Sequence, residues 1–330
     1  MKKGVLLINL GSPDSTDVKD VKKYLREFLM DPLVIDSPYL IRKLVVELAI
    51  LPTRPAASAE AYKKIWWEEG SPLITLSKRV QKKIAAKSEL PIALGMRYQN
   101  PSIQSAMQEL HDKGVREVLV IPLYPQYTMS STETVVLKTN ELQKKFFKDM
   151  NLTFLNSFYN RPDYIKVLAD RIKEQLPEHY DKLLFSFHGI PERHDNKAIA
   201  KGKKYPDLNI KTYRDQCYET TELVRQELGL PEDKIFVSFQ SRLGKDPWIK
   251  PYTDFILRDF PAEGVKNLAI VAPAFVSDCL ETLEEIAMGG MEIFEENGGE
   301  HYTYLACLND TGPWIDVLLK WINGWKSSKS

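Results

Sequence analysis

His188 is the residue of this sequence whose type and position most clearly permit chemistry. It ends the apolar run Leu183 to Phe187 and is followed at once by Gly189 and Pro191. Open α/β sheets bind ligands at the carboxyl ends of their strands, and a neighbouring glycine allows a close approach of the ligand. A histidine there can accept a proton or bind a metal ion near neutral pH. The alternative interpretation is a histidine that only ends a strand through backbone hydrogen bonds.

A second group of reactive side chains lies in the segment SDCLETLEEI, residues 277–286, and just beyond it. Its acids follow one another at intervals of three, four and seven residues: Asp278, Glu281, Glu285 and Glu292. This spacing puts them on one face of an α-helix, where like charges repel unless they share a proton or a cation. An N-cap at Ser277 or Asp278 would explain two of the acids, but not four. Carboxylates near an imidazole suit divalent ions, Fe²⁺ included.

Polar and aromatic side chains also follow three apolar runs in the first half of the chain. They are Asn9, Gly11 and Pro13, then Arg97 and Tyr98, then Tyr124, Tyr127, Ser130 and Ser131. If each run is a strand, these residues share one edge of a sheet. Arginine, aromatic rings and hydroxyls there suit a large flat ligand that bears carboxylates, although each tyrosine alone could be an ordinary rim residue. The sequence has neither a dinucleotide-binding glycine motif nor a P-loop.

Short apolar runs alternate with helix-length amphipathic segments along the whole chain. The predicted strands are 4–10, 92–96, 117–123, 152–155, 183–187, 235–239 and 268–272. The predicted helices include 17–29, 102–113, 132–148, 164–175, 213–227, 253–258 and 280–297. Strands that are apolar on both faces and are joined by helices predict parallel sheets covered on both sides. The predicted fold class is therefore α/β.

An internal repeat divides this α/β chain into two similar Rossmann-like lobes. LLINLGSPD, residues 6–14, is echoed by LLFSFHGIPE, residues 183–192, with His188 as the extra residue; GVREVLVIPLYP from Gly114 resembles GVKNLAIVAPAF from Gly264. We predict a first lobe over 1–157, a second lobe over 158–308 that carries His188 and Glu281, and an active-site cleft between them. The remaining segment, 309–330, predicts a tryptophan-bearing helix that packs back on the first lobe.

The spacing of the repeats leaves about 27 additional residues in the first lobe. They include most of the apolar, proline-punctuated segment 28–56. This segment is either a helix packed on the sheet or an exposed apolar lip that contacts a bilayer surface or admits a flat hydrophobic ligand.

Composition excludes several other classes of protein. Lys plus Arg and Asp plus Glu are both 45, so no nucleic-acid partner is expected. No signal peptide and no membrane-spanning run is evident, which favours a cytoplasmic location. The three cysteines, Cys217, Cys279 and Cys307, are too few and too far apart for a disulfide framework or a four-thiolate iron–sulfur cluster.

Taken together, these motifs resemble the ferrochelatase family, the terminal enzymes of haem synthesis. The resemblance covers almost the whole chain: NLGSP, GSPL at 70–73, GMRY, LYPQY, FHGIP, FQSRLGKDPWIKPYTD at 239–254 and SDCLETLEEI. It implies a chelatase-like fold and a lyase activity that inserts Fe²⁺, as a substrate, into a porphyrin and releases two protons. No permanently bound cofactor is implied.

The resemblance also assigns roles to particular residues. It makes His188 and Glu281 the catalytic pair, and His188, Glu281, Asp278 and Glu285 the metal-binding side chains. It places the porphyrin against Asn9, Leu10, Tyr62, Ser71, Arg97, Tyr98 and Trp248. Tyr127 is added to these substrate-binding candidates because it follows a predicted strand of the first lobe. His188 would accept pyrrole protons, ligate iron briefly, or both, while the cleft holds the ring bent so that its nitrogen lone pairs are exposed.

Two departures from the family limit the transfer. Many relatives carry a histidine where this chain has Cys279, so a mechanism with a second imidazole there is not expected. Relatives with an iron–sulfur cluster supply one thiolate in the LYPQY segment, where this chain has Met129, and three more near a C-terminal extension. We therefore expect a cluster-free enzyme.

Several alternatives stay open at this point. Protoporphyrin IX is the expected substrate, with coproporphyrin III as the alternative. A cobalt or nickel chelatase that acts on another tetrapyrrole, and a haem or metal carrier without turnover, are the competing functions. A monomer is favoured, and the apolar lip at 28–56 would allow peripheral contact with the inner membrane.

Overall fold

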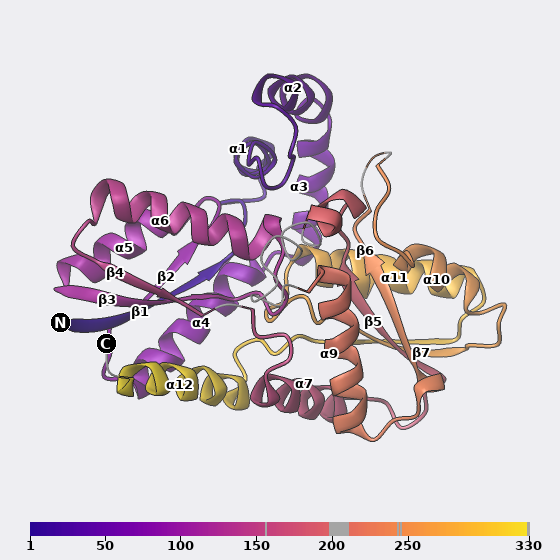
Figure 1. Ribbon diagram of the computed structural model, residues 1–330. Helices are drawn as coiled ribbons and strands as arrows, with labels where there is room; N and C mark the ends of the chain where they lie inside the picture. Colours follow the sequence, from indigo (N-terminus) through magenta and orange to yellow (C-terminus); the bar gives the residue numbers. More distant parts are fainter. Residues whose placement is uncertain (156, 198–210, 243, 245, 329–330) are drawn as a thin grey trace. The chain divides into compact units, whose positions relative to one another are not determined.

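The chain forms two compact units in the computed structural model (Figure 1). The first unit combines Met1–Ser157 with Asn309–Ser330, and the second unit is Phe158–Leu308. The structure describes residues 1–155, 157–197, 211–242, 244 and 246–328.

The first unit is built on a parallel sheet in the order β2-β1-β3-β4. Its elements are β1 (Lys2–Asn9), α1 (Val18–Leu29), α2 (Tyr39–Leu44), η1 (Val45–Ile50), α3 (Arg54–Ile65), α4 (Pro72–Lys87), β2 (Ile92–Met96), α5 (Ile103–Asp112), β3 (Val115–Pro122), η2 (Met129–Glu133), α6 (Thr134–Phe146), β4 (Asn151–Phe154) and α12 (Gly312–Ser327). Helix α5 packs on the three strands β1, β2 and β3 with α6 beside it, while α4 packs on β2 and α12 packs on α4 (Figure 1). Helices thus cover both faces of the sheet.

The second unit repeats this plan with a parallel sheet in the order β6-β5-β7-β8. Its elements are α7 (Pro162–Gln175), β5 (Lys182–His188), α9 (Tyr213–Leu228), η4 (Glu232–Lys234), β6 (Ile235–Gln240), α10 (Thr253–Asp259), β7 (Asn267–Val271), η5 (Glu281–Gly289), α11 (Gly290–Glu296) and β8 (His301–Leu305). In strand order, β5 occupies the place that β1 has in the first unit. The predicted α/β fold with two similar halves is therefore confirmed.

The central strand of each sheet supplies the core of its unit. Val5 to Ile8 of β1 and Leu183 to Phe185 of β5 have no solvent exposure. A buried side chain of this size contributes about 1.5–3 kcal/mol relative to an exposed one, which fixes each central strand and the residues that follow it. His188 and Asn9 are the last residues of these two strands.

The apolar segment 28–56 folds into α2 and the π-helix η1, which leads on to α3. Val46 is fully buried and packs with Leu29 and Leu51, whereas Leu40 and Leu48 are each 71% exposed. Figure 1 shows α2 standing away from the sheet of the first unit. The structure thus leaves these two leucines exposed rather than covered on the sheet. No helix in the described ranges is long and apolar enough to cross a bilayer.

Two elements differ from the sequence prediction. The predicted helix 280–297 is a π-helix, η5, followed directly by the α-helix α11. Strand β8 was not predicted, because its sequence HYTYL carries polar residues and only Leu305 is fully buried. Both elements lie in the part of the second unit that carries the acidic residues.

Candidate active site

His188 is held in place through its own backbone. The register pairs His188 with Gln240 of β6, and the Gly189 amide donates to the Gln240 carbonyl at 2.8 Å. On the other side, the Tyr213 hydroxyl donates to the His188 carbonyl at 2.8 Å. Tyr213 begins α9, and its amide donates to the carboxylate of Asp195 at 2.8 Å. The backbone of His188 is thereby fixed by two elements of the second unit.

The His188 imidazole is partly exposed and densely surrounded by protein. Its Nδ1 is buried and has no hydrogen-bond partner among the residues that the structure describes. Burial lowers the pKa of His188, and the negative charge of Glu281 opposes this shift. Phe275 stands edge-on to the imidazole, with ring centroids 6.1 Å apart. Burial therefore favours the neutral imidazole near neutral pH, with a ring nitrogen that none of the described residues occupies and a carboxylate within electrostatic range.

Gly189 permits a close approach beside His188. A Cβ atom there would lie 2.7 Å from the Gln240 carbonyl oxygen and 3.2 Å from the Trp248 ring, so a side chain would displace the backbone. The residues after Gly189 pair with the segment around Trp248: the Glu192 amide donates to the Pro247 carbonyl at 2.9 Å. Trp248, predicted to line the substrate site, therefore packs against the turn that follows His188.

Glu281 and Glu285 lie on the π-helix η5. The carboxylate of Glu285 is fixed by Ser241, whose amide donates to Oε1 at 2.7 Å and whose hydroxyl donates to Oε2 at 2.5 Å. Ser241 has a φ of 65°, a left-handed conformation that is uncommon for serine and that directs both groups to one carboxylate. Burial raises the pKa of Glu285, and these hydrogen bonds oppose the shift. π-helical turns are frequent at functional sites.

Asp278 lies just before the π-helix and is only 5% exposed. Its Oδ1 accepts hydrogen bonds from the Tyr304 hydroxyl at 2.5 Å, the Thr282 hydroxyl at 3.1 Å and the Cys307 amide at 3.3 Å. These donors come from η5, from β8 and from the residues after β8. Asp278 therefore joins the start of the π-helix to the neighbouring strand.

The predicted row of carboxylates changes in the structure. The α-helical spacing that put Glu292 in the row does not hold through a π-helix, and Glu292 is exposed on α11. No group of three or more His, Cys, Asp or Glu side chains in the described ranges is arranged to hold a metal ion. The structure brings His188 and Glu281 into electrostatic contact, while Glu285 and Asp278 are bound by hydrogen bonds of the protein.

All three cysteines are buried and unpaired. Burial raises the pKa of the Cys279 thiol, and the nearby Glu281 carboxylate raises it further. A buried neutral thiol does not replace the proton-accepting capacity of a histidine at this position.

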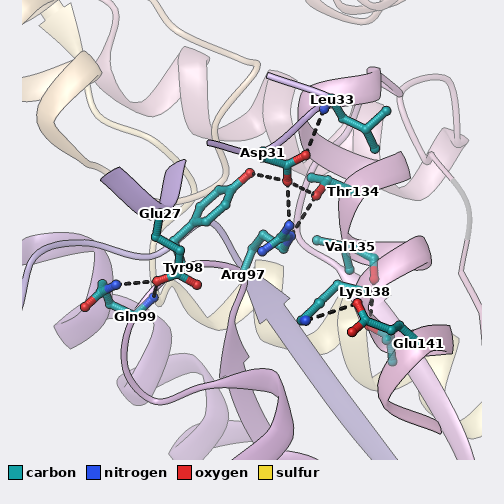
Figure 2. Close-up of polar contacts among 11 residues, drawn as sticks. Glu27, Asp31, Leu33, Arg97, Tyr98, Gln99, Thr134, Val135, Lys138 and Glu141 are labelled. Carbon is teal, nitrogen blue, oxygen red and sulfur yellow. Dashed lines mark hydrogen bonds and ion pairs between the residues drawn. The ribbon is translucent and has the colours of Figure 1, made fainter. Parts of the chain in front are cut away.

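Arg97 and Tyr98 belong to a buried polar cluster of the first unit (Figure 2). Arg97 forms an ion pair with Asp31 at 2.5 Å, and its Nε donates to the Thr134 hydroxyl at 2.7 Å. The Tyr98 hydroxyl donates to Asp31 at 2.9 Å, and Tyr98 is fully buried. Of the two predicted substrate residues, Arg97 retains some exposure, whereas Tyr98 lies in the core with its hydroxyl already used.

The other predicted residues of the first unit are mostly internal. Asn9 is 5% exposed and donates to the Ser77 hydroxyl at 3.2 Å. Tyr62 and Ser71 are also buried, and the Tyr62 ring stands edge-on to Tyr24. Leu10 and Tyr127 are partly exposed; the Tyr127 hydroxyl donates to Glu133.

Three residues that position the reactive groups were not predicted: Tyr213, Ser241 and Asp31. Each acts through a contact with a residue distant in the sequence, by 25, 44 and 66 positions respectively. Only Ser241 had a local signal, because it lies two residues after the end of the predicted strand 235–239.

Comparison with known proteins shows what the chain as a whole is similar to. A family model named ferrochelatase matches residues 2–324. The ferrochelatase of Ectopseudomonas mendocina (strain ymp) is 46% identical over 325 residues, which cover 95% of this chain and 95% of that protein. The ferrochelatase of Pseudomonas fluorescens biotype C is 44% identical, again over 325 residues and with 95% of each chain covered.

Solved structures agree on the fold. SirB from Bacillus subtilis, determined with Fe³⁺, matches with a TM-score of 0.57 at 10% identity and covers 99% of this chain and 96% of its own. The sirohydrochlorin chelatase SirB from Bacillus subtilis subspecies spizizenii, in complex with cobalt, matches with a TM-score of 0.56 at 9% identity. This match covers 98% of the present chain and 94% of that protein. At this identity the likeness concerns the fold alone, and it confirms the predicted chelatase-like architecture.

Proposed function

Because this chain belongs to the ferrochelatase family, an enzyme family that inserts metal into a tetrapyrrole, we propose that it inserts Fe²⁺ into protoporphyrin IX to form haem. The porphyrin loses two pyrrole protons and the ring nitrogens bind the iron, so the charge balances without a redox step. The groups required are a base that is neutral before the reaction and carboxylates that attract the cation.

One observation carries this proposal: burial lowers the pKa of His188, its Nδ1 has no hydrogen-bond partner among the described residues, and the negative charge of Glu281 acts on the imidazole. Burial holds the imidazole in the form that can accept a pyrrole proton or ligate Fe²⁺. The Glu281 carboxylate stabilises the imidazolium that forms after proton transfer, since opposite charges attract strongly where water is scarce. We assign His188 and Glu281 the catalytic roles.

Glu285 and Asp278 have supporting roles in this proposal. Glu285 lies on the same π-helix as Glu281, and Ser241 holds its carboxylate in one orientation. It is therefore suited to attract Fe²⁺ towards Glu281. Asp278 is assigned to the support of the helix rather than to iron, because its Oδ1 already accepts three hydrogen bonds.

The first unit supplies candidates for contact with the porphyrin. Arg97, Leu10 and Tyr127 keep some exposure near the carboxyl ends of β1, β2 and β3, where α/β sheets bind ligands. Tyr62, Ser71, Tyr98 and Asn9 support this edge from within. Trp248 is assigned to the same function in the second unit.

Protoporphyrin IX is preferred over coproporphyrin III because of the exposed apolar helix. Protoporphyrin IX carries two carboxylates and is poorly soluble in water, whereas coproporphyrin III carries four. An enzyme with exposed Leu40, Leu44 and Leu48 is suited to receive the more apolar ring at a lipid surface. An anaerobic assay with the two porphyrins and Fe²⁺ tests this: kcat/KM should be at least about tenfold higher for protoporphyrin IX, a difference of 1.4 kcal/mol. A preference for coproporphyrin III would contradict the proposal.

Contact with a membrane surface follows from the same helix. Leu40 and Leu48 are each 71% exposed on one short stretch, and burial of such side chains in lipid is favourable. Co-sedimentation with phosphatidylcholine–phosphatidylglycerol vesicles should detect binding that Leu40→Asp and Leu48→Asp abolish. Leu137→Asp is the matched control, because Leu137 is 54% exposed on α6. Equal binding of all variants would exclude the helix as the contact.

We also propose that the reaction needs no iron–sulfur cluster. The sequence has three cysteines, and all of them are buried. None belongs to a group of side chains in the described ranges that could hold a metal ion. Protein purified anaerobically after iron supplementation should have full activity and no absorbance of a cluster. A cluster absorbance in the active protein, with activity that is lost when the cluster is removed, would refute this part of the proposal.

A further inference from the structure

Asp31 is the centre of the buried cluster in the first unit, and none of the motifs had indicated it. It follows α1 and the loop residue Met30, and its side chain is 2% exposed. Its Oδ2 accepts hydrogen bonds from Arg97 at 2.5 Å, Tyr98 at 2.9 Å and Thr134 at 2.5 Å (Figure 2). These donors come from the end of β2 and the start of α6. A buried carboxylate with three donors is held rigidly, because each bond restricts the others.

Asp31 determines which donors of Arg97 remain available. The Arg97 Nη2 is bound by Asp31 and its Nε by Thr134. Thr134 accepts from Arg97 and donates to Asp31, so the three side chains close a ring of hydrogen bonds. None of the described residues accepts a hydrogen bond from Nη1. The Arg97 side chain is 12% exposed, so the guanidinium is fixed along one edge and a small part of it reaches solvent.

Asp31 also anchors the start of the exposed apolar segment. Its Oδ1 accepts from the Leu33 amide at 2.8 Å, and its main-chain oxygen accepts from the amides of Val34 and Ile35 at 3.1 and 3.0 Å. Leu33 to Ile35 lead into α2. One residue thus fixes both Arg97 and the base of the apolar helix.

We propose that Asp31 is a positioning residue for porphyrin binding. It holds the Arg97 guanidinium so that Nη1 is presented to a carboxylate of the porphyrin, and it acts through Arg97 rather than by touching the substrate. This inference rests on the proposed function, because it takes a carboxylate-bearing porphyrin as the ligand. A carboxylate binds with a more favourable free energy to a fixed guanidinium than to a mobile one, because less side-chain freedom is lost on binding.

The test is a double-mutant cycle on the full-length protein with protoporphyrin IX and Fe²⁺ under anaerobic conditions. We expect Asp31→Asn to raise the KM for porphyrin about tenfold, with kcat within about twofold, because a charge-assisted hydrogen bond is replaced by a neutral one. Arg97→Gln should raise the same KM at least as much. The double variant should be no worse than Arg97→Gln alone, because Asp31 acts only through Arg97.

Asp149→Asn is the matched control. Asp149 pairs with Arg116 at 2.6 Å in the same unit, at the opposite, amino-terminal end of the strands, so its loss should leave both constants unchanged. Thr134→Val is the milder variant if Asp31→Asn does not fold. It keeps the Asp31–Arg97 ion pair and removes one hydroxyl, and we expect an increase in KM of about threefold.

Two results would overturn the inference. One is a lower Tm with an unchanged KM for porphyrin in Asp31→Asn, or in Thr134→Val if Asp31→Asn does not fold. This is the behaviour expected of an ion pair that only stabilises the fold. The other is a double variant whose KM increase is the product of the two single increases. Absence of metalloporphyrin formation by the wild-type protein would instead refute the proposed function, so the two failures are distinguishable.

Discussion

Removal of the Tyr213 hydroxyl should show whether this group only stabilises the fold around His188 or also positions His188 for the reaction. Tyr213→Phe deletes the hydrogen bond of 2.8 Å to the His188 carbonyl and the contact of the same hydroxyl with the buried Cys217 thiol, while the buried ring can stay in place. The carbonyl is then left without this donor in a protein interior. A buried acceptor that loses its partner costs about 1–3 kcal/mol of unfolding free energy. For a protein of 330 residues, Tm should fall by about 1–2 °C for each kcal/mol.

The same change should reduce activity through the geometry of His188. The imidazole is attached to the backbone that Tyr213 holds, and a displacement of about 1 Å at a reacting group can lower the rate a hundredfold. We expect a smaller displacement and a decrease in kcat of about tenfold, which corresponds to 1.4 kcal/mol of activation free energy. The KM for porphyrin should stay within about twofold, because Tyr213 is not assigned to substrate binding.

Anaerobic metalation kinetics and thermal unfolding measure both effects on the same sample. Thr220→Val is the matched control, because it removes another buried hydroxyl of α9, which donates to the Tyr159 carbonyl at 3.0 Å. It should lower Tm by a similar amount with kcat unchanged. A Tyr213→Phe variant that loses stability but retains the kcat of the wild type would show that the hydroxyl is only structural.

Three further predictions follow from the second unit. Burial lowers the His188 pKa below the ordinary value of 6.5, so activity should fall as the pH decreases through this lowered pKa. The unfolding free energy should also fall below pH 6.5, because the unfolded chain then binds more protons than the folded one. A pH–rate profile with an acid limb above 6.5 would contradict this. Ser241→Ala should raise the KM for Fe²⁺ but not that for porphyrin, because it removes the hydroxyl that holds Oε2 of Glu285 and leaves the amide bond to Oε1. Equal effects on both constants would refute the assignment. Asp278→Ala should lower the unfolding free energy by at least about 2 kcal/mol, because the Tyr304 hydroxyl and the Cys307 amide lose their acceptor. Denaturation with an unchanged midpoint would contradict the role of Asp278 in supporting the π-helix.

The strands and the position of His188 could be predicted from the sequence because they depend on local patterns. Central strands buried on both faces read as unbroken apolar runs, as Leu183 to Phe187 does, and the residue after such a run must lie at the edge of the sheet. The repeat of LLINLGSPD in the second half then predicted the second sheet. The structure has a four-stranded sheet in each unit, with corresponding strand orders.

The π-helix could not be predicted because its acids fit two kinds of helix. Glu281 and Glu285 are four residues apart, which is about one turn of an α-helix and slightly less than one turn of a π-helix. The two differ only over longer distances, and the position of Glu292 reveals the difference. Prediction of a continuous α-helix therefore placed Glu292 in a row that it does not join.

The positioning residues were missed because their partners are distant in sequence. Asp31 follows a helix and precedes a proline, so its local pattern is that of a turn residue. Nothing near it indicates that Arg97 and Thr134 supply its donors. Tertiary contacts of this kind are visible only once both segments have been placed.

The most direct test of the central claim is the metalation activity of His188→Ala. The wild-type protein should form haem over many turnovers from free Fe²⁺ and protoporphyrin IX under anaerobic conditions. His188→Ala should lose at least about a hundredfold in kcat, the contribution typical of a general base, while porphyrin binding measured by fluorescence stays within about twofold. Near-normal turnover by His188→Ala would contradict the assignment of His188 as the group that accepts the protons or ligates the iron.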